Sequence, residues 1–177
     1  IEFVSFGDNH SSSRIDVSTT GFSFENLKII DNPLNHNIRS TFSVNASSDI
    51  SFINNELILT AIEDGAKFSS AINIYSDDNY ISDINIINNK ISQYVENNAI
   101  DISAENGLNN INISGNEISD NRRAINFWSS VCSDVSISDN EMIDNDTGLD
   151  TAIECLEAIN FKNNKIYGDP SCEEGED

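Results

Sequence analysis

Near the end of the chain, several aspartates and an arginine fall at matching positions when the sequence is offset by a period of 24 residues. Subtracting one period places Asp120 over Asp144 and Arg122 over Asp146, and Asp169 falls at the same corner. Ca²⁺ takes several oxygen ligands, so Asp120, Asp144, Asp146 and Asp169 are candidate calcium ligands. Carboxylates beside an arginine could instead abstract a proton next to a uronate carboxyl group, with Asp120, Arg122, Asp144 and Asp146 as catalytic candidates. We prefer a solvated acidic corner with an Arg122–Asp146 surface pair, because a charge cluster alone indicates a site only weakly.

The single tryptophan, Trp128, is a candidate sugar-stacking residue. It follows Phe127 in an alternating segment, and side chains of a strand point to opposite faces in turn. With Ile125 and Phe127 inside, Trp128 is expected to face outward, and Tyr75 after Ile74 would extend the same face. Exposed aromatic rings can stack on carbohydrate. The alternative for Trp128 is a surface ring packed against a neighbouring loop.

Three cysteines lie in the last third of the chain, and an odd number excludes a fully paired disulfide framework. The separation of Cys132 and Cys155 is one position shorter than the period, so we expect them at one corner of adjacent turns and within disulfide range. Cys172 could pair with Cys155 instead or link to another chain. A disulfide is typical of an extracellular protein.

Composition excludes several classes of protein. The 177 residues include 30 acids and 9 bases, a net charge of -21, and a strongly acidic chain lacks the basic face that nucleic-acid binding requires. No apolar run is long enough for a membrane span. Asn, Ile and Ser are abundant and together make up close to half of the chain. A polar, charged composition suggests disorder unless the isoleucines recur with a period.

An eight-residue pattern supplies that period: apolar, polar, apolar, two variable residues, Asn, a charged residue and apolar. Six copies occur, at 22–29, 50–57, 84–91, 111–118, 135–142 and 159–166. The last three copies follow one another at the shortest spacing, the 24-residue period, and the earlier copies contain insertions. The alternation predicts strands, and a second strand motif follows the copies, as in Ile100–Ile102. Short strands at this period predict an all-β solenoid of about six rungs, in which neighbouring turns bury each other's apolar faces.

Two columns of polar residues follow from the repeat. The asparagines of the pattern share one register and are expected to form a structural ladder of amides, with Leu27 in this place in the first copy: Asn55, Asn89, Asn116, Asn140 and Asn164. The next column is charged and should face water, with opposite charges at its first three steps: Lys28, Glu56, Lys90, Glu117, Glu141 and Lys165.

The rungs, such as Ile111-Asn-Ile113-Ser-Gly-Asn116-Glu117-Ile118, resemble the right-handed parallel β-helix superfamily, the pectate-lyase-like fold. The resemblance covers about residues 15–167. It implies a right-handed parallel β-helix, a fold that carries lyases, hydrolases, epimerases, phage tail fibres, adhesins and structural stalks. For an enzyme, the resemblance implies action on a polysaccharide along a groove on one strand face.

The sequence thus predicts an entry strand and loop at 1–14, the solenoid at 15–167 and an acidic tail at 168–177. Because the chain begins with Ile1 and not Met, we expect a fragment or a mature form. Our leading hypothesis is a secreted or surface-exposed structural or adhesive domain that contacts glycans, with calcium as the one cofactor considered. Open solenoid ends favour end-to-end self-association or flanking domains. The alternative is a lyase or epimerase acting on acidic polysaccharide.

Overall fold

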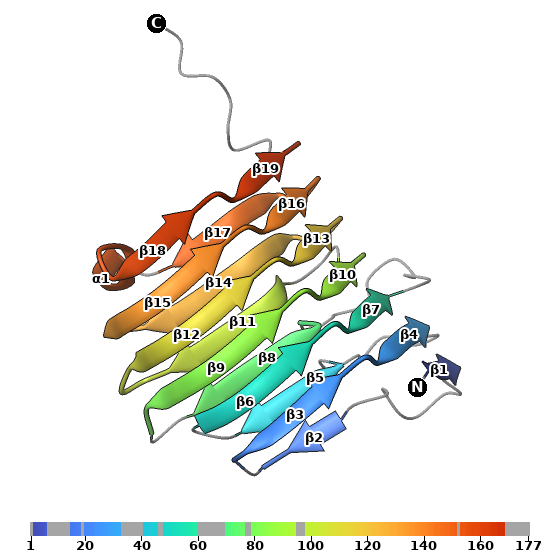
Figure 1. Cartoon of the computed structure of the whole chain (residues 1–177), viewed down its shortest axis with the longest axis horizontal. Coiled ribbons are helices and arrows are strands. Elements are labelled where there is room, and N and C mark those ends of the chain that lie inside the picture. Colours follow the sequence, from blue (N-terminus) through green and yellow to red (C-terminus); the bar gives the residue numbers. More distant parts are fainter. Residues whose placement is uncertain are drawn as a thin grey trace, which may run out of the picture.

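The computed structural model describes residues 2–6, 15–18, 20–32, 41–45, 48–59, 70–76, 79–94, 98–151 and 153–168. Within them the chain coils into three parallel sheets, and each strand pairs with strands one turn away (Figure 1). The all-β solenoid expected from the repeat is therefore confirmed. The three sheets are called A, B and C below.

Each turn of the coil passes through sheet C, sheet A and sheet B in that order. Sheet C contains β3 (Phe22–Glu25), β6 (Ser48–Ile53), β9 (Ile81–Ile87), β12 (Leu108–Ser114), β15 (Cys132–Ser138) and β18 (Ile159–Lys162). Sheet A contains β1 (Glu2–Phe6), β4 (Lys28–Asn32), β7 (Glu56–Leu59), β10 (Lys90–Ser92), β13 (Glu117–Ser119), β16 (Glu141–Ile143) and β19 (Lys165–Tyr167). Sheet B contains β2 (Ile15–Val17), β5 (Phe42–Asn45), β8 (Ile72–Ser76), β11 (Asn98–Ala104), β14 (Arg123–Ser129) and β17 (Thr147–Thr151). A single short helix, α1 (Ile153–Leu156), lies between β17 and β18 among the described residues.

The rung count differs slightly from the expectation of about six. Five successive turns, beginning with β3, β6, β9, β12 and β15, have a strand in all three sheets. The sixth copy of the repeat contributes only β18 and β19 among the described residues, so it is a partial turn. At the other end β1 pairs with β4, with Glu2 opposite Lys28, so strand pairing begins before the expected boundary at residue 15.

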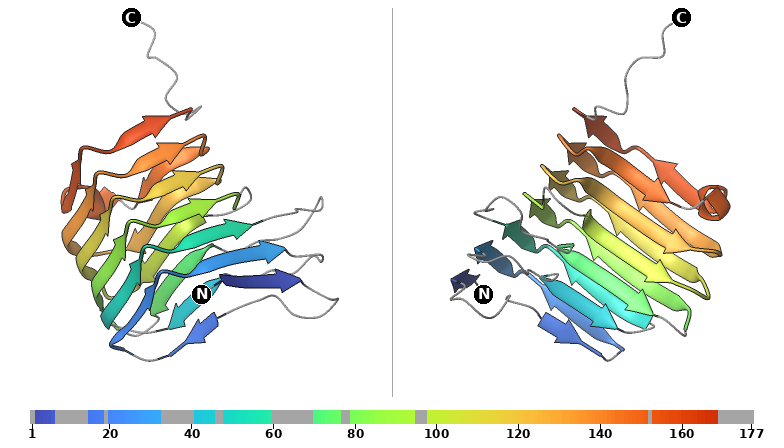
Figure 2. Two further views of the ribbon diagram at one scale, coloured as in Figure 1. Left: turned by 45° about the vertical axis from the view of Figure 1, so that its right-hand side comes forward. Right: turned by 180° about the vertical axis from the view of Figure 1, so that it is seen from behind.

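The coil is right-handed. In Figure 1 the chain runs from left to right through sheet C at the front and climbs from blue to red. The rear view in Figure 2 shows sheet B returning on the far side. This hand is the usual one for connections between parallel strands.

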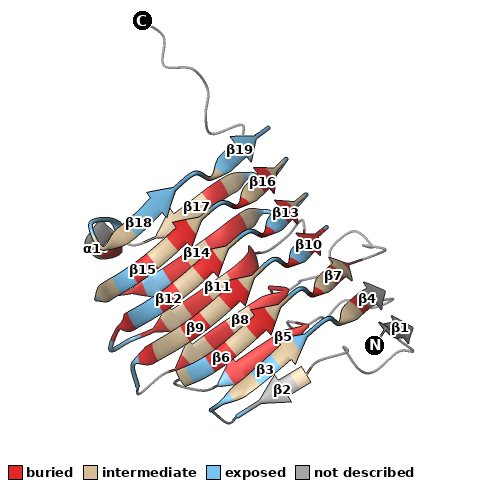
Figure 3. Ribbon diagram, viewed as in Figure 1, coloured by how far each residue is buried: buried red, intermediate tan, exposed pale blue. Residues whose placement is uncertain are grey.

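The core lies between the three sheets and is filled mainly by alternate residues of the strands (Figure 3). In β12, Ile111 and Ile113 are buried, whereas Asn112 between them is half-buried on the outer face. Each inward isoleucine lies in register with inward residues of the turns on either side, as Ile111 does with Ile84 and Val135. A modest apolar content therefore suffices, because neighbouring turns cover each other.

Left-handed backbone positions form columns at the corners of the coil. Before the asparagine ladder, the second variable residue of the repeat has positive φ in all six copies: Asn26, Asn54, Asn88, Gly115, Asp139 and Asn163. A second column follows sheet A and comprises Gln93, Asp120, Asp144 and Gly168. A third lies in the sheet C strands and comprises Asp49, Asp83, Asn110 and Asp134. Asn, Asp and Gly tolerate this conformation best, which explains much of the unusual composition.

Candidate functional site

The predicted asparagine ladder is confirmed and is buried at the corner between sheets C and A. Asn116 is representative: its Nδ2 donates to the Asn140 Oδ1 (2.8 Å) and to the Ile86 carbonyl (2.9 Å). Its own Oδ1 accepts from the Asn89 backbone N–H (2.8 Å) and Nδ2 (3.0 Å). The same bonds join Asn55 to Asn89 and Asn140 to Asn164. This column is structural, because its polar groups are paired within the protein.

A second, shorter ladder lies where the sequence predicted an acidic corner. Asn121 and Asn145 lie one 24-residue period apart in adjacent turns, and both are buried. The Asn121 backbone N–H (3.1 Å) and Nδ2 (2.9 Å) donate to the Asn145 Oδ1. One turn earlier the Tyr94 N–H donates to the Asn121 Oδ1 (3.0 Å), and the Tyr94 hydroxyl bonds Thr41 (2.7 Å). The corner is thus anchored by amides, not by carboxylates.

The aspartates of this corner are exposed, and two of them occupy left-handed backbone positions. Asp120 and Asp144 have φ values of 56° and 50° and occupy the left-handed column that ends at Gly168. At Gly168 φ is 73°, and a Cβ there would meet the Asp144 carboxylate, so a larger residue would require that exposed side chain to shift. Arg122 and Asp146 are exposed but form no ion pair; the ion pairs of the described residues are Lys28–Glu56, Lys90–Glu117 and Arg123–Asp150. The predicted Arg122–Asp146 surface pair is therefore wrong.

The described part of the chain does not assemble a calcium site from these aspartates. No three His, Cys, Asp or Glu side chains within it lie close enough together to hold a metal ion, so Asp120, Asp144 and Asp146 are not brought together as ligands. Asp169, the fourth predicted ligand, lies outside the described residues. Asp120 and Asp144 occupy left-handed positions one turn apart, and Asp146 lies outside that column.

The outer face of sheet B has the other predicted site residues. Trp128 faces outward with 60% of its surface exposed, as the alternation predicted. Tyr75 is half-buried on the same face and lies in the same column, but Ser103 separates the two rings. At one strand spacing per step, Tyr75 and Trp128 are roughly 10 Å apart. Asn45 begins the column one turn before Tyr75.

A hydrogen-bonded network lies beside this aromatic column. The Asp101 carboxylate accepts from Asn126 Nδ2 (2.8 Å), Asn98 Nδ2 (3.0 Å) and the Ser70 hydroxyl (3.3 Å). Arg123 then links β14 to β17 through a 2.7 Å ion pair with Asp150. Sequence reasoning missed these residues, although Asp101, Asn126 and Asp150 are the outward residues of successive sheet B motifs.

The sheet B face therefore combines an exposed ring with fixed polar groups. The network holds amides, carboxylates and a guanidinium in place on rigid strands, so binding to them costs little side-chain entropy. Sugars present hydroxyls to such groups and an apolar ring face to an aromatic side chain. We refer to Tyr75, Asp101, Arg123, Asn126, Trp128 and Asp150 as the sheet B face.

Two ionisable groups on the outer columns have shifted pKa values. Hydrogen bonds from Ser82 (2.7 Å) and Asn110 (2.6 Å) stabilise the Asp83 carboxylate and lower its pKa. A hydrogen bond and charge attraction from Glu117, with a smaller contribution from Glu56, raise the pKa of Lys90. Apart from the Ser82 bond, these contributions come from stacked neighbours one turn away, so they reflect the solenoid and not a reactive cluster.

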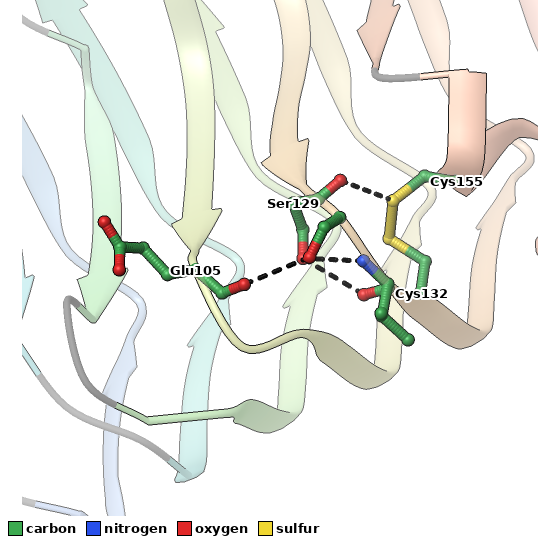
Figure 4. The surroundings of a disulfide bond; sticks show 6 residues. Glu105, Ser129, Cys132 and Cys155 are labelled. Atoms are coloured by element: carbon green, nitrogen blue, oxygen red, sulfur yellow. Dashed lines mark hydrogen bonds between the residues drawn. A yellow bond between two sulfur atoms is a disulfide. The ribbon is translucent and has the colours of Figure 1, made fainter.

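The predicted Cys132–Cys155 disulfide is present and joins the start of β15 to α1, with the Cα atoms 5.0 Å apart. Figure 4 shows it beside the turn that follows β14, where the Cys155 sulfur lies 3.5 Å from the Ser129 carbonyl. In the same turn the Ser130 hydroxyl donates to the Glu105 carbonyl (3.1 Å). Cys172, which could have competed for this pairing, lies outside the described residues.

Comparisons with known proteins give no relative from which a function could be transferred. No protein-family model, curated protein or solved structure matches the chain significantly. Among the described residues no helix is long and apolar enough to cross a membrane. The structure itself shows a parallel β-solenoid. A function has to be argued from the sheet B face.

Proposed function

We propose that this chain is a secreted or surface-exposed structural or adhesive domain of the pectate-lyase-like β-helix type, which contacts glycans through the sheet B face. The observation that carries the proposal is Trp128, which is 60% exposed on a rigid strand beside the Asp101 network. Exposing a large aromatic ring to water is unfavourable, and a flat ring next to fixed hydrogen-bonding groups suits a pyranose.

The charge of the molecule favours neutral or amino-bearing glycans over polyuronates. The sheet B face has two carboxylates, Asp101 and Asp150, against one guanidinium, and the whole chain has a net charge of -21. A polyanion would be repelled during approach at low ionic strength. This charge also weighs against the alternative of a lyase or epimerase that acts on acidic polysaccharide.

An extracellular location fits the disulfide. Cysteine pairs persist in oxidising compartments and are rare where thiols are kept reduced. The Cys132–Cys155 bond is the feature of the structure that supports this part of the proposal.

The proposal is tested by binding to insoluble glucan, chitin, chitosan and pectate. Because Trp128 is the only tryptophan, its fluorescence reports directly on contact with soluble oligosaccharides. We expect retention on at least one neutral or amino-bearing glycan, a change in emission on binding, and a loss of affinity of about fivefold or more in Trp128→Ala. Tyr80→Ala is the matched control, since Tyr80 is an exposed ring that does not belong to the sheet B face.

Two results would count against this function. Equal retention of Trp128→Ala and the parent chain would remove the sheet B face from recognition. Release of unsaturated products from pectate or alginate would instead establish the lyase alternative, and Arg122→Ala would then test the corner around Asp120 and Asp144.

A further inference from the structure

The two ends of the coil close their cores differently. Toward the N-terminal end, Phe22, Phe24, Phe42 and Phe52 pack together with ring centroids 4.7–6.5 Å apart. At the C-terminal end, inward-facing residues are open to water (Figure 3): Phe161 is 42% exposed and Ile166 39% exposed. Their register partners one turn earlier, Ile137 and Met142, are fully buried. Among the described residues, the core columns therefore stop at β18 and β19.

The same two strands are sheet edges. Among the described residues β18 pairs only with β15, and β19 pairs only with β16. Their outer sides present backbone N–H and C=O groups in the register of a parallel ladder. Such an edge is a template for another strand.

The asparagine ladder has a direction, which specifies what the next strand must offer. In each step the backbone N–H and Nδ2 of one asparagine donate to the Oδ1 of the next, as Asn140 does to Asn164 at 3.0 and 2.8 Å. Asn164 also donates to the Ile137 carbonyl behind it (2.8 Å). Its forward donors meet no further ladder member among the described residues. An incoming strand that places a carboxamide at this register would satisfy them.

The charges of this end are equally specific. Lys162 and Lys165 lie exposed on β18 and β19 in a strongly acidic molecule. Earlier lysines in the Lys165 column pair with the glutamate of the following turn, Lys28 with Glu56 (3.0 Å) and Lys90 with Glu117 (2.7 Å). The matching position of an added turn would thus hold an acid.

We propose that the edge formed by β18 and β19 binds an extended polypeptide segment of the pattern apolar, polar, apolar, two residues, Asn, Glu, apolar, which adds as a further turn of parallel strands. The partner is thus a segment with the chemistry of the chain's own repeat. A second copy stacked head to tail would not continue the asparagine ladder. Its first strand in sheet A is β1, which has Glu2 in the Lys28 register, and the residue before Glu2 is Ile1, which has no carboxamide for Asn164.

The test uses the full chain and a labelled peptide with the sequence of residues 108–119, in which Asn116 and Glu117 occupy the two key positions. Fluorescence anisotropy should show saturable binding. Two control peptides each contain one substitution, Asn116→Leu or Glu117→Lys, which introduces the residue of the first repeat at that position. Both should bind about fivefold more weakly or worse. Non-specific attraction to an acidic protein would favour the lysine peptide, so the expected order opposes bulk electrostatics.

A charge swap locates the site on the protein. Lys165→Glu, an exposed substitution, should weaken the parent peptide about fivefold and strengthen the Glu117→Lys peptide by a similar factor. Arg122→Glu changes the net charge equally away from the edge and should leave both affinities unchanged. Absence of binding, equal binding of all three peptides, or an identical response to Arg122→Glu would overturn the proposal. So would sedimentation showing a concentration-dependent dimer that Lys165→Glu dissociates, because a second copy would then occupy the edge.

Discussion

Asparagine has two separate roles in this coil, and the backbone angle distinguishes them. Asn54 has a φ of 55° and is exposed, whereas its neighbour Asn55 is buried and bonds Asn89. The first role needs a short polar side chain that tolerates the left-handed region. The second needs one donor and one acceptor on the same planar group, so that each residue can bond the turns on both sides. Asp and Gly replace Asn in the first role, at Asp139 and Gly115, but not in the ladder.

The ladder should be costly to interrupt. Asn116→Leu would leave the Asn89 N–H without its acceptor and the Ile86 carbonyl without its side-chain donor, whereas the Asn140 Oδ1 would keep the backbone N–H of residue 116. At about 1–3 kcal/mol for each buried group that loses its partner, we expect unfolding free energy to fall by about 2 kcal/mol or more. Urea unfolding followed by circular dichroism measures it. Asn109→Leu, the same change at an exposed position of β12, should alter stability by less than about 0.5 kcal/mol.

The Lys90–Glu117 pair should be visible in a titration. Glu117 raises the Lys90 pKa above its ordinary value of 10.5, so the folded state binds this proton more tightly than the unfolded state. Its contribution to stability is fully present below pH 10.5 and is lost as pH rises through the folded pKa. The carbon shift of the Lys90 Cε reports this pKa by NMR. Glu117→Gln should bring it back toward the ordinary value, whereas Glu141→Gln should not.

Among the secondary-structure elements, the disulfide fixes the connection between β17 and β18, which contains the short helix α1. Cys132 and Cys155 have a sequence separation of 23 and tie α1 to the start of β15. Loop-closure entropy for this length predicts that Cys132→Ser with Cys155→Ser lowers unfolding free energy by about 3 kcal/mol. The check is urea unfolding of the double variant against the parent, with reductant added to the parent as a second route to the same loss. A loss below about 0.5 kcal/mol would mean that the neighbouring strands hold α1 without it.

The strand architecture could be predicted from sequence because stacking forces one residue type into each column. The ladder members share a register that the sequence itself displays, from Asn55 to Asn164. Likewise, the alternation around Phe127 predicted that Trp128 faces outward, as it does. The repeat period placed Cys132 and Cys155 in adjacent turns, where they form the disulfide.

The site was harder to predict, for two physical reasons. Aspartates at left-handed positions look the same in sequence as aspartates that bind a ligand, and Asp120 and Asp144 belong to the first kind. The Asp101 network depends on sheet B register, in which Asp101 lies opposite Asn73 on one side and Asn126 on the other, at two unequal sequence offsets. Superposition by one fixed period does not reveal those neighbours.

For the whole molecule, the linear arrangement means that each turn is stabilised by its neighbours alone. The net charge of -21 adds repulsion that the stacked Lys–Glu pairs offset only locally. Central turns are covered on both sides, whereas terminal turns are covered on one. Stability should therefore vary along the coil axis instead of being shared uniformly.

Hydrogen exchange should reveal this gradient, and it should be asymmetric. Amides of β12 and β14 lie between paired strands and should exchange slowest. Amides of β18 and β19 should exchange fastest, because Phe161 and Ile166 are 42% and 39% exposed, and β3 should be intermediate because Phe24 packs in the aromatic cluster. Mass spectrometry of peptides covering 108–129, 22–29 and 159–167 measures the order. Phe24→Ala should reduce protection of 22–29 and leave 159–167 unchanged, whereas equal protection of all three segments would show that the coil opens as one cooperative unit.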